Sequence, residues 1–561
     1  MQQKIRFGIM CGGTIFPQWQ ADAIVNLLKL KETVPGLLIV SKNASPKWYR
    51  KVYDYLEFNK LFWMIYMFYI RGRLKSSKRI DLSEQLKAFQ KIECQTIRKG
   101  KYSNYFSADD IQKIRDFQLD FILRFDFGII RGDILTVARY GIWSFHHDDE
   151  EKYRGTPPCF WEIYFDDKVT AAVLQRLTEK LDSGIVLYKA FLKTQPSYVK
   201  NRDQLFSESS KWPYLLCINL LNNKIDKINN SPSVTKAPIY KVPTNWQFVK
   251  FMIKSNLLKL REFFKWLFYV NYWNIGIANG HISSFLSDQK PEINWYPLTS
   301  KKVFLADPFA FCDIDNPSKL HIFFETYDFR KSKGIIQYTC FDKEFSSPVT
   351  VIEEVNHLSY PYIVQNEEEI FIIPECFESK TVASYVVKTF PYKWERKHEM
   401  IHNFEGVDNT VIKRDGLYWM FTSDKREGLS YNLKIYFADA LNGNWIPHPN
   451  NPVKSDIRSS RSAGTPFEFN NSLYRPSMDN SESNEGRIVI NKITRLTTTE
   501  FEEVAVKTVF PYESSCYPDK IHTICSSGKY TVVDGARRVH IFSNWHFLVY
   551  RFQTIMKKVK L

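Results

Sequence analysis

The hydrophobic pattern of the sequence changes near residue 240, which limits the chain to folds built from at least two parts. Before that point, short apolar runs alternate with segments of helical spacing. We expect strands over Lys4–Met10 and Gly36–Val40, a helix between them to about Leu30, and a buried strand over Asp120–Phe127. Strands that alternate with helices favour an α/β domain with a parallel sheet over residues 1–240.

Residues 291–545 show a different pattern, in which many short strands are separated by turns. Leu320–Glu325, Gly334–Cys340 and Leu417–Thr422 are examples. Evenly spaced short strands favour a closed or radial all-β architecture, either a sandwich or a propeller. Similar strand and turn units recur at blade-like intervals, so we predict a propeller. The length of 561 residues agrees with two domains, because a single core rarely exceeds roughly 250 to 300 residues.

Three segments rich in aromatic and basic residues lie outside these two patterns. They are an insertion at about 47–103, a connector at 241–290 and a tail at 546–561. The connector has the spacing of an amphipathic helix. Two interpretations stay open for all three segments: packing against the protein itself, or contact with an anion or a bilayer surface.

The charge and cysteine content narrow the partners and the compartment. Lysine and arginine exceed aspartate and glutamate by 16, which favours an anionic partner. No nucleic-acid recognition motif is present, so we expect no nucleic-acid partner. The nine cysteines are scattered without a CxxC pair, and no apolar run reaches the length of a membrane span. We therefore expect a cytoplasmic protein, with peripheral contact at the inner face of the membrane left open, and the oligomeric state stays undetermined.

The most informative motif is GIWSFHHDDEEKYRGTPP at 141–158, followed by LDSG at 181–184. This pair resembles the N10-formyltetrahydrofolate-dependent formyltransferases, which carry Asn-x-His, a Tyr-Arg-Gly turn and Asp-x-Gly. The resemblance covers about the first 200 residues and implies a Rossmann-like α/β domain. It also implies N10-formyltetrahydrofolate as cofactor. The site residues that it implies are His146, Asp182 and Ser144 for catalysis, and Gly128, Tyr153, Arg154 and Gly155 for cofactor binding.

Formyl transfer to an amine develops an oxyanion and releases a proton. His146 can donate to the oxyanion or carry the proton, and Asp182 can orient the imidazole. Two features depart from the family. Ser144 stands where the family has Asn, and the loop at 148–151 is Asp-Asp-Glu-Glu. These acids can bind a cationic amino group, deprotonate it or face water. The neighbouring His147 should point to the opposite face of its strand, so we predict no metal site.

The second half carries FLADPF at 304–309, HLSYPY at 357–362, VDNT at 407–410 and DGLYWMF at 415–421. In this order they resemble five-bladed propellers of the glycoside hydrolase 43 and 32 type. They are also similar to the propeller-like domain of glucosamine inositolphosphorylceramide transferases. Candidate substrate-binding residues are Asp307, Glu325, Glu375, Asp408, Arg461 and Arg475. The alternative is that the acids form turns and that the arginines pair with them.

Together these features predict a formyltransferase that acts on the amino group of an amino sugar during surface polysaccharide synthesis. Whether that sugar is nucleotide-linked or lipid-linked stays open. The alternative is a glycan-binding or glycosyl-processing propeller protein whose formyltransferase domain has lost its chemistry. The change from Asn to Ser144 motivates this alternative.

Overall fold

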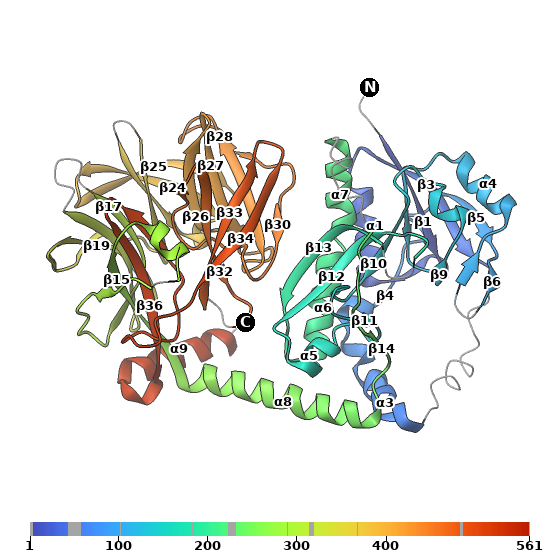
Figure 1. Cartoon of the computed structure of the whole chain (residues 1–561), viewed down its shortest axis with the longest axis horizontal. Helices are drawn as coiled ribbons and strands as arrows, with labels where there is room; N and C mark the ends of the chain where they lie inside the picture. Colours follow the sequence, from blue (N-terminus) through green and yellow to red (C-terminus); the bar gives the residue numbers. More distant parts are fainter. Residues whose placement is uncertain are drawn as a thin grey trace. The chain divides into compact units, whose positions relative to one another are not determined.

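The computed structural model describes the chain except for residues 1–3, 43–57, 101–102, 181–183, 223–231, 289, 313–318, 367–368, 483–485 and 560–561. It divides into two compact units, Met1–Leu260 and Arg261–Leu561. The division falls inside the expected connector. Each unit is considered by itself (Figure 1).

Unit 1 is built on a seven-stranded sheet of order β13-β12-β10-β8-β1-β3-β5. Its strands are β1 Ile5–Cys11, β3 Thr33–Ser41, β5 Gln90–Cys94, β8 Phe121–Arg124, β10 Ile142–His146, β12 Val169–Arg176 and β13 Ile185–Lys193. The five strands from β5 to β10 run parallel, as the alternation of strands and helices predicts. The edge differs from that prediction, because β12 and β13 form an antiparallel hairpin.

Helices and short strands surround this sheet. The helices are α1 Gln18–Leu28, α3 Leu61–Ile70, α4 Ala108–Asp116, α5 Trp161–Phe165, α6 Tyr198–Ser209 and α7 Trp212–Leu221. The short strands are β2 Ile15–Pro17, β4 Arg79–Asp81, β6 Ile97–Lys99, β7 Ser103–Tyr105, β9 Ile129–Ile130, β11 Arg154–Gly155 and β14 Ile239–Tyr240. The described part of the insertion at 47–103 contains helix α3, single helical turns and short strands.

Residues 245–268 of the predicted connector form helix α8, Asn245–Phe268. The later part of the connector differs from the prediction, because Tyr269–Asn279 is a strand of unit 2. The first half of α8 packs on unit 1 through the buried side chains Phe248 and Phe251. None of the described helices has the length and apolarity that crossing a membrane requires.

Unit 2 consists of five antiparallel sheets that follow one another in sequence. The first contains β15 Tyr269–Asn279, β16 Ile293–Trp295, β35 Ile524–Ser527 and β36 Tyr530–His540. The second contains β17 Val303–Cys312, β18 Leu320–Asp328, β19 Lys333–Asp342, β20 Glu344–Phe345 and β21 Val349–Ile352, and the third β22 Ser359–Gln365, β23 Ile370–Glu375, β24 Thr381–Thr389 and β25 Lys393–His402. The fourth contains β26 Gly406–Arg414, β27 Leu417–Asp424, β28 Asn432–Ala438, β29 Ile446–Pro447 and β30 Lys454–Ser455, and the fifth β31 Phe467–Phe469, β32 Ser472–Asp479, β33 Arg487–Leu496 and β34 Phe501–Val509. Helix α9, Trp545–Val559, follows.

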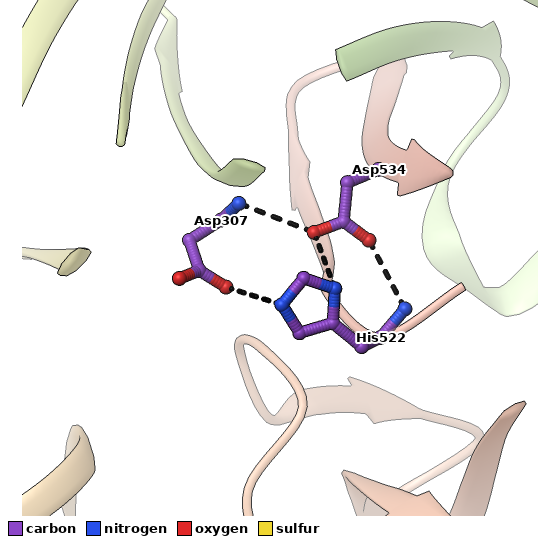
Figure 2. A group of neighbouring side chains, drawn as sticks. All are labelled: Asp307, His522 and Asp534. Atoms are coloured by element: carbon purple, nitrogen blue, oxygen red, sulfur yellow. Dashed lines mark hydrogen bonds and ion pairs between the residues drawn. The ribbon is translucent and has the colours of Figure 1, made fainter. Parts of the chain in front are cut away.

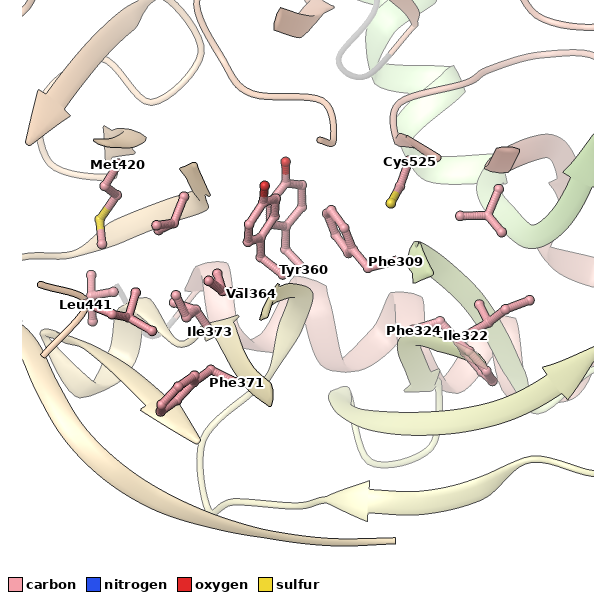
Figure 3. Close-up of a cluster of buried hydrophobic side chains, with 14 of the residues drawn as sticks. Phe309, Ile322, Phe324, Tyr360, Val364, Phe371, Ile373, Met420, Leu441 and Cys525 are labelled. Atoms are coloured by element: carbon pink, nitrogen blue, oxygen red, sulfur yellow. The ribbon is translucent and has the colours of Figure 1, made fainter. Parts of the chain in front are cut away.

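The first strands of neighbouring sheets contact one another, from β15 to β17, then β22 and β26. Strand β15 pairs with β36 along all of its length, so the beginning and the end of the unit share one sheet. Aromatic and aliphatic side chains from successive sheets, among them Phe309, Tyr360, Ile373 and Met420, form a continuous core (Figure 3). The all-β, propeller-like architecture predicted for this half of the sequence is confirmed.

Candidate functional site

A pocket of about 320 Å³ opens in unit 1 at the carboxyl ends of β8 and β10. Ligands of open α/β sheets bind at this edge. Ser144 and His146, two of the three predicted catalytic residues, line it. The third, Asp182, lies outside the described residues, although Gly184 of the same motif also lines the pocket.

Arg124, the last residue of β8, lines the pocket and was missed by the sequence analysis. The register of the parallel strands sets it directly beside Ser144. Its Nε and Nη2 donate to Ser144 Oγ at 3.2 and 2.7 Å, and Nη1 donates to the carbonyl of Gly128. Burial lowers the pKa of Arg124 to about 10, so the guanidinium stays charged at neutral pH. The pocket therefore contains a cation next to the hydroxyl that replaces the family's amide.

The two neighbouring histidines point to opposite faces of β10, as the strand geometry predicts. His146 lines the pocket. His147 stacks on Phe206 at 3.7 Å between ring centroids, and its Nε2 lies 3.0 Å from Ser209 Oγ. Burial holds the pKa of His147 well below its usual range. His147 is thus a neutral, partly buried residue packed against aromatic side chains.

The four predicted cofactor-binding residues separate into two pairs. Gly128 and Gly155 line the pocket. Gly155 has φ 109°, and a Cβ there would lie 2.0 Å from the carbonyl oxygen of Tyr240, so only glycine fits. Tyr153 and Arg154 are not among the described residues that line the pocket. Tyr153 Oη donates to Asp167 at 3.3 Å, and Arg154 Nε donates to the carbonyl of Ala237 at 2.7 Å, so both hold the turn.

The acidic loop after His146 binds a cation of the chain itself. Lys189 Nζ on β13 lies 2.8 Å from Asp149, 3.2 Å from Glu150 and 3.4 Å from Glu151. Asp148 is buried and accepts from the backbone N–H of Cys159 at 3.3 Å. The sequence left three roles open for these acids: binding a cationic amino group, deprotonating it, or facing water. In the structure they bind an ammonium group, and this group is the side chain of Lys189.

A second group of charged side chains lies in unit 2. His522 sits between two carboxylates, with Nε2 3.1 Å from Asp307 and Nδ1 2.8 Å from Asp534 (Figure 2). Burial opposes protonation of His522, but Asp534 and Asp307 outweigh it and raise the pKa well above the ordinary value. These three residues have the composition of a metal site. In the structure they form an ion-paired triad, with His522 between the carboxylates of Asp307 and Asp534.

The other predicted acids of unit 2 gather around this triad. Asp408 pairs with Arg461, and its backbone N–H donates to Glu375 at 3.1 Å. Burial and the nearby Asp408 raise the pKa of Glu375 well above its usual range. Glu325 lies 3.6 Å from His357.

Asp307 and Asp408 each form a turn, and their side chains also join the central cluster. Asp307 and Asp408 have φ of 50° and 52°, and each sits at a bulge in the first strand of its sheet. The bulge interrupts the ladder and redirects the side chain. Asp-Pro and Asp-Asn are thus both turn formers and members of the central cluster.

Arg475, also predicted to bind substrate, has a different place. It is fully buried, with Nε and Nη2 bonded to Glu503 at 2.9 and 2.7 Å. Nη1 and Nη2 also donate to the carbonyls of Ser460 and Ser459. These contacts make Arg475 a core residue, and we remove it from the candidate site.

Comparison with known proteins supports the two predicted resemblances. The family model described as "Glucosamine inositolphosphorylceramide transferase 1, N-terminal" matches residues 294–517. A glucosamine inositolphosphorylceramide transferase 1 from Oryza sativa subsp. japonica is 31% identical over 248 residues, which are 41% of this chain and 32% of that protein. A methionyl-tRNA formyltransferase from Prochlorococcus marinus is 28% identical over 164 residues, which are 28% of this chain and 47% of that enzyme.

Among solved structures, a family 117 glycoside hydrolase from Zobellia galactanivorans covers 48% of this chain and 91% of its own, at 12% identity and a TM-score of 0.31. The chain spans less than half the length of the rice and Prochlorococcus relatives. It is therefore similar to formyltransferases in one part and to glucosamine inositolphosphorylceramide transferases in another. Both groups are transferases.

Proposed function

We propose that the protein transfers a formyl group from N10-formyltetrahydrofolate to the amino group of an amino sugar during synthesis of a surface polysaccharide. The observation that carries this proposal is the juxtaposition of Arg124, Ser144 and His146 in one pocket. All nine cysteines are free in the structure, which supports a reducing compartment, and we place the reaction in the cytoplasm.

The residues of the pocket fit the cofactor. Its volume of about 320 Å³ lies at the lower end of the range for small-molecule sites, roughly 300 to 1,000 Å³. Ile130, Leu177 and Ile239 offer apolar surface to a flat ring, and Lys180 adds a cation for a carboxylate. When bound, the cofactor supplies the electrophilic formyl carbon.

The residues of the chain would stabilise the charge that develops during attack by the amine. Ser144 Oγ accepts two bonds from Arg124, so its own hydrogen is left to donate into the pocket. Arg124 places a positive charge behind this donor. The imidazole of His146 is the group that takes or gives a proton at the reacting nitrogen. A serine can therefore fill the place of the family's amide, because the arginine polarises it.

The choice of an amino sugar rests on the second unit. The family model that matches residues 294–517 and the rice relative both carry glucosamine in their name, and the acids of unit 2 are of the kind that bind sugar hydroxyls. Whether the sugar is linked to a nucleotide or to a lipid is part of the acceptor screen.

The test is formylation of a panel of amino sugars by the full chain, followed by mass spectrometry, together with calorimetric binding of a stable N10-formyltetrahydrofolate analogue. The His146→Ala variant should bind the analogue but lose at least about 10²-fold in rate. Arg139→Ala, an exposed arginine outside the pocket, is the control and should match the wild type. Equal rates for His146→Ala and wild type would exclude the assignment.

A second candidate function is glycan binding by unit 2 with an inactive unit 1. Two observations favour it: Ser144 replaces the family's Asn, and the family model covers only residues of unit 2. Saturable binding of oligosaccharide by the full chain, without binding of the folate analogue, would favour this candidate over formyl transfer.

A further inference from the structure

The part of helix α8 that lies in unit 1 has a second apolar face that none of the described residues of that unit covers. Trp246, Ile253, Leu257 and Leu260 repeat at helical spacing and are 65, 56, 60 and 50% exposed. Phe248 and Phe251, which point the other way, already pack the helix onto unit 1. An apolar stripe opposite the packed face adds nothing to the core and exposes apolar area to water.

Helix α3 is next to the start of α8 (Figure 1). Its apolar side chains are exposed in the same manner. The rings of Tyr66 and Phe248 are 5.3 Å apart, and the backbone N–H of Phe62 donates to Asn245 Oδ1 at 3.0 Å. On α3, the side chains of Ile65, Phe68 and Tyr69 are 57, 82 and 62% exposed. The two helices thus contribute neighbouring apolar surfaces within unit 1.

Cations lie directly against the exposed aromatic rings. The Arg73 guanidinium is 4.3 Å from the ring centroid of Tyr69 and donates to its hydroxyl at 2.6 Å. Lys250 Nζ is 5.3 Å from the ring centroid of Trp246. Tryptophan and tyrosine with neighbouring lysine and arginine are typical of the level of lipid headgroups, where one end of the side chain is apolar and the other is polar.

An open pocket of about 650 Å³ lies immediately after α3 and adds more positive charge. Arg71, Lys75 and Lys78 line it, and none of the three side chains is ion-paired within the described part of the chain. Its two carboxylates, Asp22 and Asp203, instead accept hydrogen bonds from neutral groups. The pocket can therefore receive the phosphate of a lipid headgroup.

We propose that unit 1 docks on an anionic phospholipid bilayer, with α3 and α8 lying in the interface and their basic neighbours on the headgroups. The occupant follows from charge complementarity. The chain carries a net charge of +16, and a second copy would bring the same cations to this surface and repel it. Apolar burial and attraction to anionic lipid act together in such helices. The proposal is independent of formyl transfer.

The test is flotation of the full chain with vesicles of phosphatidylcholine alone and of phosphatidylcholine with phosphatidylglycerol at 3:1. We expect binding only to the anionic vesicles, weakened by salt. The double variant Phe68→Asp/Leu257→Asp should lose binding. Its matched control is Val355→Asp/Val504→Asp, which makes the same charge change at exposed valines of unit 2 and should leave more of the binding intact.

A second pair of variants tests the cations. Arg73→Glu/Lys250→Glu should weaken binding on the order of tenfold or more, because each basic residue near an anionic surface contributes about 1 kcal/mol. Lys393→Glu/Lys529→Glu, exposed lysines of unit 2, makes the same change in net charge and should weaken binding less. Circular dichroism of every variant checks that the fold is intact.

Three results would overturn the proposal. The first is equal binding to neutral and anionic vesicles. The second is equal loss in the surface variants and their matched controls, since net charge alone would then explain the binding. The third is a wild-type protein that does not bind vesicles but forms a dimer in light scattering, and a Phe68→Asp/Leu257→Asp variant that is monomeric. That result would assign the surface to a second copy of the chain. Competition by millimolar glycerol phosphate should leave flotation unchanged, and displacement would assign the pocket to a free phosphate.

Discussion

The pocket of unit 1 and the centre of unit 2 both collect charged side chains, but they use them differently. In unit 1, Arg124 donates to a hydroxyl and a carbonyl, and no carboxylate neutralises it by contact in the described residues. In unit 2, His522 and Arg461 are each held by carboxylates of the cluster. A charge without a contacting counter-ion is available to a reacting group, whereas a charge in a contacting ion pair mainly fixes the fold. The comparison favours unit 1 as the place of chemistry.

The largest effect should come from the most buried ion pair. Arg475→Met leaves Glu503 in the interior with only Lys454 as a partner. We expect the free energy of unfolding of unit 2 to fall by about 3–5 kcal/mol, measured by denaturant titration of the full chain. The control Arg458→Met breaks an exposed pair with Asp456 and should cost about 0–1 kcal/mol. Similar losses in both variants would contradict a structural role specific to Arg475.

In unit 1 the corresponding substitution should affect rate more than stability. Arg124→Ala removes the cation behind Ser144 and should lower formyl transfer by about 10²- to 10³-fold. Binding of the folate analogue and the thermal unfolding temperature serve as controls. If the variant loses stability as Arg475→Met does while its rate per folded molecule is unchanged, the contrast between the two units fails.

The triad of unit 2 predicts a pH dependence. The pKa of His522 is raised in the folded state, so its protonation stabilises the fold fully below the unfolded pKa of about 6.5. This contribution is lost as pH rises through the folded pKa. His522→Gln should therefore destabilise the protein most near pH 6, by about 1–3 kcal/mol, and less at higher pH. Thermal unfolding of both proteins between pH 6 and 9 gives the difference, and a gap that widens with pH would reverse the assignment.

The smallest effect is expected at the hydroxyl of unit 1. Ser144→Ala removes one neutral donor but leaves Arg124 in place. We expect a loss of about fivefold in formyl transfer, corresponding to about 1 kcal/mol for one hydrogen bond. Initial rates at saturating cofactor measure it. A loss as large as that of Arg124→Ala would show that the arginine acts only through the serine.

Local patterns were enough to predict much of the scaffold. A short apolar run indicates β1, and the geometry of a strand places His146 and His147 on opposite faces. Gly155 in the Tyr-Arg-Gly turn must be glycine, because a Cβ at this position would clash with the backbone of Tyr240. This requirement makes the motif recognisable in the sequence. These features depend on neighbours in sequence or on the geometry of a single strand.

The features that the sequence analysis missed all depend on distant partners. Arg124 meets Ser144 only through the register of two parallel strands. Lys189 reaches the acidic loop from β13, and Arg475 reaches Glu503 from another strand of its sheet. A basic residue at the end of a buried strand was a usable signal for Arg124. No local pattern in the sequence predicts the pairing of Lys189 with the acidic loop or of Arg475 with Glu503.

The pairing of β15 with β36 has a consequence for synthesis. The second partner of this ladder, Tyr530–His540, is translated about 250 residues after the first. Until it emerges from the ribosome, the edge of β15 that it will cover has open backbone groups, and the ring of sheets cannot close. Nascent unit 2 should therefore depend on chaperones that shield strand edges, while unit 1 can already fold.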